Sequence, residues 1–83
     1  YQELRMLEKA GKISGLRRQV AFELAPAVVI GKRKRPALRY IADYVYRENG
    51  EQVVEDVKGI RTEGYRIKRH LMATVHGIAI KET

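Results

Sequence analysis

Apolar residues recur at helical spacing near the start of the chain. Leu4, Leu7 and Ala10 lie on one face of such a helix, and Gly11 follows directly as a stop. The pattern therefore predicts a helix over residues 1–10. No capping residue precedes it and the chain does not begin with Met, so we expect an N-terminally truncated fragment whose first helix continues upstream.

The same period returns near the end of the chain. Ile67, Leu71 and Val75 predict a second helix that stops at Gly77, after the loop 60–64. The apolar residues 78–80 then predict a short final strand.

Between the helices the period changes to two. Alternation around Val20, Phe22 and Leu24 predicts a half-buried strand that Pro26 closes, with residues 27–30 as an extension. Residues 31–36 are predicted to be an exposed basic loop, because Pro36 does not suit a central strand.

Asn49-Gly50 is the strongest short-range feature of the chain. It separates two segments rich in Val, Ile and Tyr, residues 38–46 and 52–58, and this combination predicts a β-hairpin. The element order is then helix, three strands, helix, strand. We expect a single α+β domain over residues 1–83, with an αβββαβ order and a central mixed sheet flanked by helices.

The hairpin predicts a specific cluster of charges. With Asn49 and Gly50 in the turn, Asp43 lies opposite Asp56 and Ile41 opposite Lys58. Two opposed carboxylates repel each other at about 5 Å between Cβ atoms, so a cation is expected between them. Mg²⁺ is the natural candidate because it prefers oxygen ligands.

Composition narrows the class of protein. The chain has 83 residues, 45% hydrophobic and 33% charged, which predicts one small globular domain. It contains no cysteine, which excludes disulfides and thiolate metal sites and agrees with a reducing cytoplasm. No apolar run approaches the roughly 20 residues that span a bilayer, so we expect no membrane partner.

The net charge of +7 predicts a polyanionic partner, with nucleic acid favoured over an anionic membrane. The densest basic run is Lys32-Arg33-Lys34-Arg35. A second basic group follows the hairpin and consists of Arg66, Lys68 and Arg69, with Tyr65 directly before it. Phosphate contacts by these groups are one interpretation, and solvated surface charge is the other.

The αβββαβ order, with Asp43 on the second strand and Asp56-Val57-Lys58 on the third, resembles the PD-(D/E)XK nuclease superfamily. The strings around 40–44, 54–59 and 65–68 further resemble a phage and prophage branch of endonucleases. The resemblance implies a restriction-endonuclease-like core in a protein of the bacterial cytoplasm. It also implies a metal-dependent endodeoxyribonuclease that acts on DNA, including branched DNA as a Holliday-junction resolvase does, and a homodimer.

By this resemblance Asp43, Asp56 and the Val57 carbonyl would bind Mg²⁺, or Mn²⁺ as a substitute, and Lys58 would orient the attacking water. Lys68 resembles a basic position that contacts DNA near the site. The superfamily also places a glutamate on the first helix, and Glu3 is the best substitute in this chain.

Several alternatives stay open. Asp43 could instead form a salt bridge with Lys58 or Arg39. The tyrosines at 40, 44 and 46 alternate onto the face opposite Asp43, where core packing is favoured over base stacking. At the level of function, the alternatives to a nuclease are a non-catalytic basic module that binds nucleic acid and a structural protein of a nucleoprotein assembly.

Overall fold

The computed structural model describes residues 1–57 and 62–83. In chain order the elements of this part are α1 (Gln2–Lys9), β1 (Ser14–Ala25), β2 (Val28–Ile30), β3 (Arg33–Arg35), β4 (Leu38–Glu48), β5 (Glu51–Asp56), α2 (Glu63–His76) and β6 (Lys81–Glu82).

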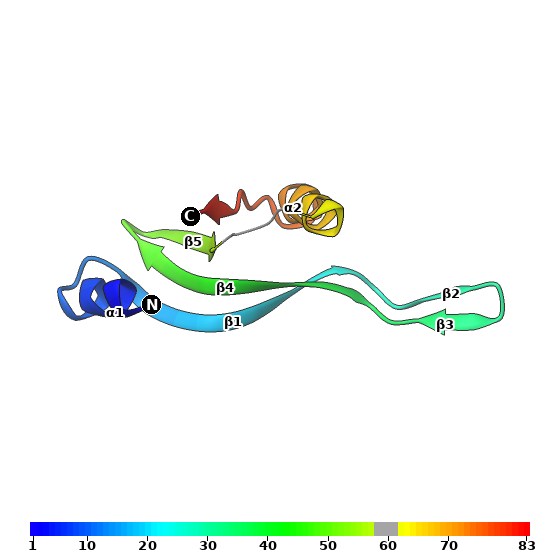
Figure 1. Cartoon of the computed structure of the whole chain (residues 1–83), viewed down its shortest axis with the longest axis horizontal. Helices are drawn as coiled ribbons and strands as arrows, with labels where there is room; N and C mark the ends of the chain where they lie inside the picture. Colours follow the sequence, from blue (N-terminus) through cyan, green and yellow to red (C-terminus); the bar gives the residue numbers. More distant parts are fainter. Residues whose placement is uncertain (58–61) are drawn as a thin grey trace.

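The main sheet has four strands in the order β1-β4-β5-β6 (Figure 1). The pairs β1–β4 and β4–β5 are antiparallel, and β5–β6 is parallel. The predicted α+β class with a mixed sheet is therefore confirmed. Strands β2 and β3 form a separate two-stranded ladder, and without them the order is αβββαβ.

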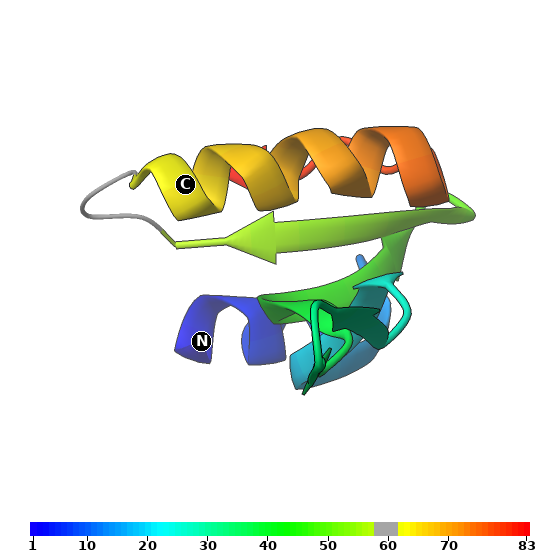
Figure 2. The ribbon, with the colours of Figure 1, turned by 90° about the vertical axis from the view of Figure 1, so that its right-hand side faces the viewer.

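The two helices lie on opposite sides of the sheet (Figure 2). The cluster under α2 contains Met72 and Tyr65 from the helix and Val45 and Val54 from the sheet. The smaller cluster under α1 contains Leu4 with residues of β4 and the α1–β1 loop. Each helix thus buries one apolar stripe on its own face of the sheet, which removes that stripe from water.

The Asn49-Gly50 turn is confirmed. Both residues have positive φ, 53° and 80°, as a type I′ turn requires, and Glu48 lies opposite Glu51. The predicted end of the second helix is also confirmed, because Gly77 adopts a left-handed conformation with φ of 67°.

The predicted basic loop 31–36 was wrong. Residues Arg33–Arg35 are a strand that pairs with β2, and Gly31, with φ of 64°, provides the turn between them. Pro36 lies just beyond this strand, where it blocks no ladder hydrogen bond of β3.

The predicted strand 78–80 was also wrong, since the last strand is Lys81–Glu82. The amide of Ile78 donates to the Met72 carbonyl at 3.1 Å and so completes the end of α2 instead of joining the sheet. Ile78 and Ile80 still pack against the core as partly buried side chains.

A third correction concerns the tyrosines of β4. Tyr40 packs in the cluster under α2, whereas Tyr44 and Tyr46 pack with α1. Strict alternation fails because Ala42 and Val45, an odd number of residues apart, share one cluster. The break lies beside Gln19 of β1, whose φ of 52° marks a local distortion of the neighbouring strand.

Candidate functional site

Two aspartates meet at the end of the β4–β5 hairpin. The ladder ends at the pair Tyr44–Glu55, and Asp43 and Asp56 are the residues that come next on the two strands. An Oδ2 atom of Asp43 also accepts a 2.8 Å hydrogen bond from the backbone N–H of Val57. This bond ties the acidic position of β4 to the residue that follows β5.

Asp56 is buried, with 2% of its surface exposed. The Tyr40 hydroxyl donates a 2.6 Å hydrogen bond to its Oδ2 atom. Burial raises the pKa of Tyr40 strongly, and the hydrogen bond to Asp56 raises it further. The tyrosine therefore remains a protonated donor at physiological pH and orients the carboxylate.

Both aspartates line one open cavity of about 370 Å³. Its wall carries cationic, aromatic and small polar groups as well as the two carboxylates; besides Asp43 and Asp56, the lining residues are Arg39, Tyr40, Ile41, Thr62, Gly64, Tyr65 and Lys68. A cavity with this mixture accommodates an anionic group beside the carboxylates only where positive charge compensates the repulsion. Lys68 and Arg39 provide such charge.

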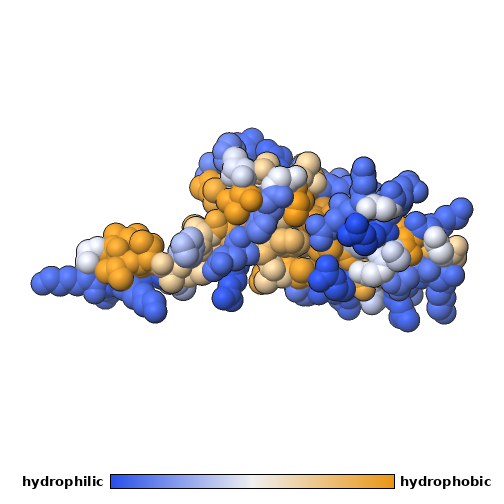
Figure 3. Space-filling view, turned by 180° about the vertical axis from the view of Figure 1, so that it is seen from behind, coloured by the Kyte–Doolittle hydropathy of each residue, from blue (hydrophilic) through white to orange (hydrophobic). Residues whose placement is uncertain are grey.

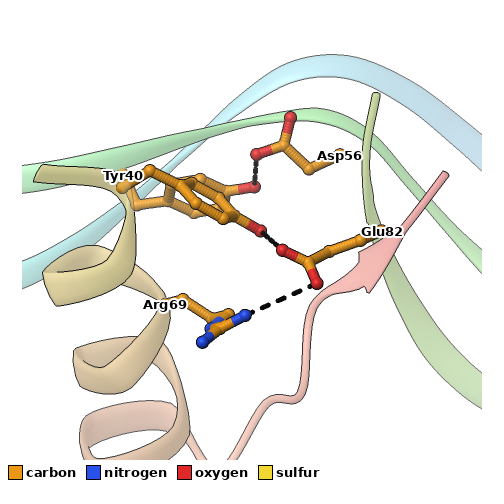
Figure 4. A network of polar contacts seen from close by, with 5 residues as sticks. Tyr40, Asp56, Arg69 and Glu82 are labelled. Carbon is orange, nitrogen blue, oxygen red and sulfur yellow. Dashed lines mark hydrogen bonds and ion pairs between the residues drawn. The ribbon is translucent and has the colours of Figure 1, made fainter. Parts of the chain in front are cut away.

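Helix α2 is fixed beside this wall by contacts at its first turn and near its middle. The Thr62 side chain accepts from the Tyr65 backbone N–H at 3.1 Å, which caps the first turn. The Tyr65 hydroxyl donates to Glu82 of β6 at 2.6 Å, and Arg69 pairs with the same carboxylate at 3.5 Å (Figure 4). Lys68 is consequently held at the cavity by a helix that is anchored to the last strand.

Two residues predicted to bind DNA have structural partners in this network. Tyr65 is only 7% exposed, and burial, followed by its bond to Glu82, raises its pKa. Arg69 is exposed but makes the Glu82 ion pair. Of this basic group, Lys68 is the member that lines the cavity with the aspartates.

Glu3 is not brought to the same cavity. It lies on α1 and lines a second cavity of about 360 Å³ on the α1 side, together with Glu55 and Val57. Val57 contacts both sites, because it lines the Glu3 cavity and its backbone amide donates to Asp43. The first-helix glutamate expected from the resemblance is therefore separated from the aspartate pair by the sheet.

Glu55 faces away from Asp56, as expected for neighbours on a strand. Its side chain is buried and paired. Tyr46 donates to it at 2.7 Å, and Lys81 lies 3.9 Å from its carboxylate. Each face of β5 thus carries one carboxylate bonded to a β4 tyrosine.

The other predicted residues lie apart from the cavity. Lys32, Arg33, Lys34 and Arg35 are exposed on the β2–β3 hairpin. Lys58 lies outside the described residues. Sequence reasoning missed Tyr40, Thr62 and Glu82 as parts of the site, and no short motif marks them.

The two carboxylates at the cavity suit a hard divalent cation, which prefers oxygen ligands. The Val57 carbonyl is a third ligand only by the resemblance; the contact that the structure shows for Val57 is the bond from its amide to Asp43. In residues 1–57 and 62–83 no three His, Asp or Glu side chains are grouped closely enough to hold a metal ion by themselves. Water and phosphate oxygens would therefore have to complete the coordination, as is usual for Mg²⁺.

The fold and this cavity define a small α+β domain with a paired-carboxylate site on a mixed sheet. The chain belongs to the family described as "Protein of unknown function (DUF1064)", whose sequence profile matches residues 1–80. Neither the curated proteins nor the solved structures gave a match. Neither helix in the described part of the chain is long and apolar enough to cross a membrane.

Proposed function

We propose that this protein is a Mg²⁺-dependent DNA endonuclease. The observation that carries the proposal is the shared cavity of Asp43 and Asp56, with Lys68 in the same wall. Opposed carboxylates at the end of a hairpin are costly in a sheet unless a cation binds them. Their placement beside a basic side chain is typical of a phosphoryl-transfer site.

Asp43, Asp56 and the Val57 carbonyl would hold the metal. The ion would supply the positive charge that activates water and stabilises the negative charge that develops on the phosphate during cleavage. Tyr40 keeps the Asp56 carboxylate in one orientation through its 2.6 Å hydrogen bond. Lys68 would attract the scissile phosphate. The resemblance assigns the orientation of the attacking water to Lys58.

The proposal that the partner is a nucleic acid is based on charge. The net charge is +7, and the exposed cations at 32–35 and on α2 give the domain the electrostatic character of a DNA-binding protein. The resemblance extends the proposal to branched DNA, and to a homodimer because cutting two strands needs two sites.

Amide substitutions test the proposal with little change in shape. Asp43→Asn and Asp56→Asn each keep an oxygen that accepts the hydrogen bond from Val57 or Tyr40 but remove the charge. We expect each to lower cleavage of plasmid DNA in Mg²⁺ about 100-fold or more. DNA affinity, measured in EDTA by fluorescence anisotropy, should change little.

Glu55→Gln is the matched control. Glu55 is also buried and also accepts from a tyrosine, but it lies on the other face of β5. It should cleave like the unchanged protein. Equal loss of activity in all three variants, or cleavage that persists in the two aspartate variants, would contradict the assignment.

A second candidate is a non-catalytic module that binds nucleic acid. It is favoured by the placement of Glu3, which lines a different cavity from the aspartates. In that case binding should fall steeply with salt, no cleavage should occur, and Mg²⁺ should add no stability.

A further inference from the structure

The β2–β3 hairpin, here termed the arm (Val28–Arg35), extends the main ladder beyond the body of the domain (Figure 1). The last pair of the main ladder, Ala25 with Leu38, and the first pair of the arm, Val28 with Arg35, belong to one register. Pro26 and Pro36 interrupt the ladder between them, one on each strand, because proline has no N–H to donate.

The arm is not part of the core. All its residues are exposed, and β2 and β3 belong to neither apolar cluster. The molecule measures 53 Å along its long axis but 25 and 19 Å across, and the arm forms one end of this axis. Stability of the domain therefore does not explain its residues.

The arm combines exposed apolar and cationic side chains. Val28, Val29 and Ile30 are 51%, 64% and 61% exposed. Across the ladder, Val28 lies beside Arg35 and Ile30 beside Arg33 on one face, and on the other face Val29 lies beside Lys34. Figure 3 shows this apolar patch at the end of the molecule, bordered by hydrophilic side chains.

The apolar half of this pattern does not suit an arm that stays in water. Exposed valine and isoleucine on a two-stranded ribbon favour association, and a purely solubilising arm would omit them. The cations at 32–35 form no ion pair with another described residue, so their charge is available to a partner. The partner must accept apolar contact and carry dense negative charge.

Duplex DNA meets both requirements. Its major groove, about 12 Å wide, admits a two-stranded β-ribbon, and it exposes thymine methyl groups between two rows of phosphates. A second copy of the arm would instead bring two sets of cations together. Three exposed apolar side chains are also too few to insert firmly into a membrane.

We propose that the arm is a β-ribbon that enters the major groove of duplex DNA, with its arginines on the flanking phosphates and its apolar residues toward the base edges. The inference rests on the DNA binding of the proposed function, and it adds the path of the duplex across the protein. The tip, Lys32, lies eleven positions before Asp43, at most about 36 Å away along an extended strand. At 3.4 Å per base pair, the arm would contact DNA about one helical turn from the cut.

The cationic contribution is tested by Arg33→Ala with Arg35→Ala, compared with Lys9→Ala and Lys12→Ala, which remove two exposed cations near α1. Binding to a linear duplex is measured in EDTA by fluorescence anisotropy across a salt series. The arm variant should reduce the slope of log affinity against log salt by about 2 and weaken binding about tenfold or more, while the control should change neither strongly.

The apolar contribution is tested by Val28→Thr with Ile30→Thr, which keeps β-branched side chains in the ribbon. Affinity should fall several-fold while the salt slope stays the same. The position is tested with Lys32→Cys, a unique labelling site because the chain has no cysteine. A hydroxyl-radical-generating chelate on this residue should cut a duplex about 10 base pairs from the protein's own cleavage position, or from the centre of its footprint in EDTA.

The outcomes separate the arm from the proposed function. Binding by arm variants that equals that of the unchanged protein, or label cuts scattered along the duplex, would overturn the arm proposal while leaving the nuclease intact. Arm-dependent binding without cleavage would sustain the arm and reject the nuclease. Arm-dependent binding to anionic vesicles with none to DNA, or arm-dependent dimerisation with unaltered DNA binding, would replace the groove by a membrane or by a second copy.

Discussion

The Tyr40 hydroxyl donates a 2.6 Å hydrogen bond to Oδ2 of Asp56, and both residues are almost fully buried, at 3% and 2% exposure. A charge-assisted bond of this length in a desolvated position is stronger than an ordinary one. It couples Tyr40 of β4 to the carboxylate that we propose binds the metal. Stability and chemistry therefore share one contact.

Removing this contact should have two separate effects. Tyr40→Phe removes one buried, charge-assisted hydrogen bond to Asp56, so the free energy of unfolding in urea should fall by about 1.5–3 kcal/mol. The Mg²⁺ concentration for half-maximal cleavage should also rise about 10-fold or more, because Asp56 loses its orienting partner.

Tyr44→Phe is the control for this substitution. Tyr44 is on the same strand and half-buried, and within the described part of the chain its hydroxyl makes no hydrogen bond. The change should cost well under 1 kcal/mol and leave the Mg²⁺ requirement alone. An equally small change in stability and Mg²⁺ requirement for Tyr40→Phe would show that the Tyr40 hydrogen bond does not orient Asp56.

Alkaline pH should unfold the domain cooperatively. Burial, then hydrogen bonding to a carboxylate, raises the pKa of Tyr40, Tyr46 and Tyr65 far above the ordinary value of 10.0. Below pH 10 these tyrosines are protonated in both states and add no pH dependence. Above it the unfolded chain ionises while the folded one does not, so stability falls by about 1.4 kcal/mol per pH unit for each tyrosine, or about 4 for the three.

The measurement is a urea titration at several pH values above 10, with tyrosinate absorbance recorded in parallel. The absorbance change of these three tyrosines should coincide with unfolding by circular dichroism. Tyr46→Phe should make the pH dependence shallower by one tyrosine's contribution. Smooth ionisation of all tyrosines in the folded domain would show that their hydroxyls are not held as described.

The hairpin turn should be sensitive to its glycine. Gly50 has φ of 80°, so Gly50→Ala should cost about 1 kcal/mol or more even though open space surrounds the position. Because this turn sets the register that opposes Asp43 and Asp56, Mg²⁺-dependent cleavage should fall more than stability alone explains.

Gly64→Ala is the matched glycine control. Gly64 lies in the first turn of α2 without a positive φ, and an added Cβ would lie 3.8 Å from the Thr62 hydroxyl, an ordinary contact. Alanine favours the helix, so this variant should unfold at the same urea concentration or a slightly higher one. An equal loss of unfolding free energy in Gly50→Ala and Gly64→Ala would argue against an effect specific to the turn.

Millimolar Mg²⁺ or Mn²⁺ should raise the thermal midpoint of the domain. An ion present at ten times its dissociation constant stabilises the folded state by about 1.4 kcal/mol. The rise should disappear in Asp43→Asn and persist in Glu55→Gln, since Glu55 faces the other cavity. A rise that survives in Asp43→Asn would place the ion elsewhere.

Local patterns predicted the parts of the fold that depend on neighbours in the sequence. Asn49 and Gly50 tolerate positive φ, and Gly77 ends a helix for the same reason, so the hairpin and the end of α2 follow from a few residues. Once the turn is known, counting along two strands opposes Asp43 to Asp56. The errors lay where other contacts decided the outcome: residues 33–35 pair with β2, Ile78 completes the end of α2 instead of joining the sheet, and the alternation of β4 breaks beside Gln19.

The sequence by itself determined the α+β element order and the aspartate pair, because periodicity and turn chemistry act over a few residues. Tertiary structure alone decided which side chains join that pair. The distortion at Gln19 accompanies the turning of Tyr40 toward Asp56, the return of β6 places Glu82 against Tyr65, and packing of α1 on the opposite face separates Glu3. These relationships depend on strand twist and on contacts between segments far apart in the chain, which no local pattern encodes.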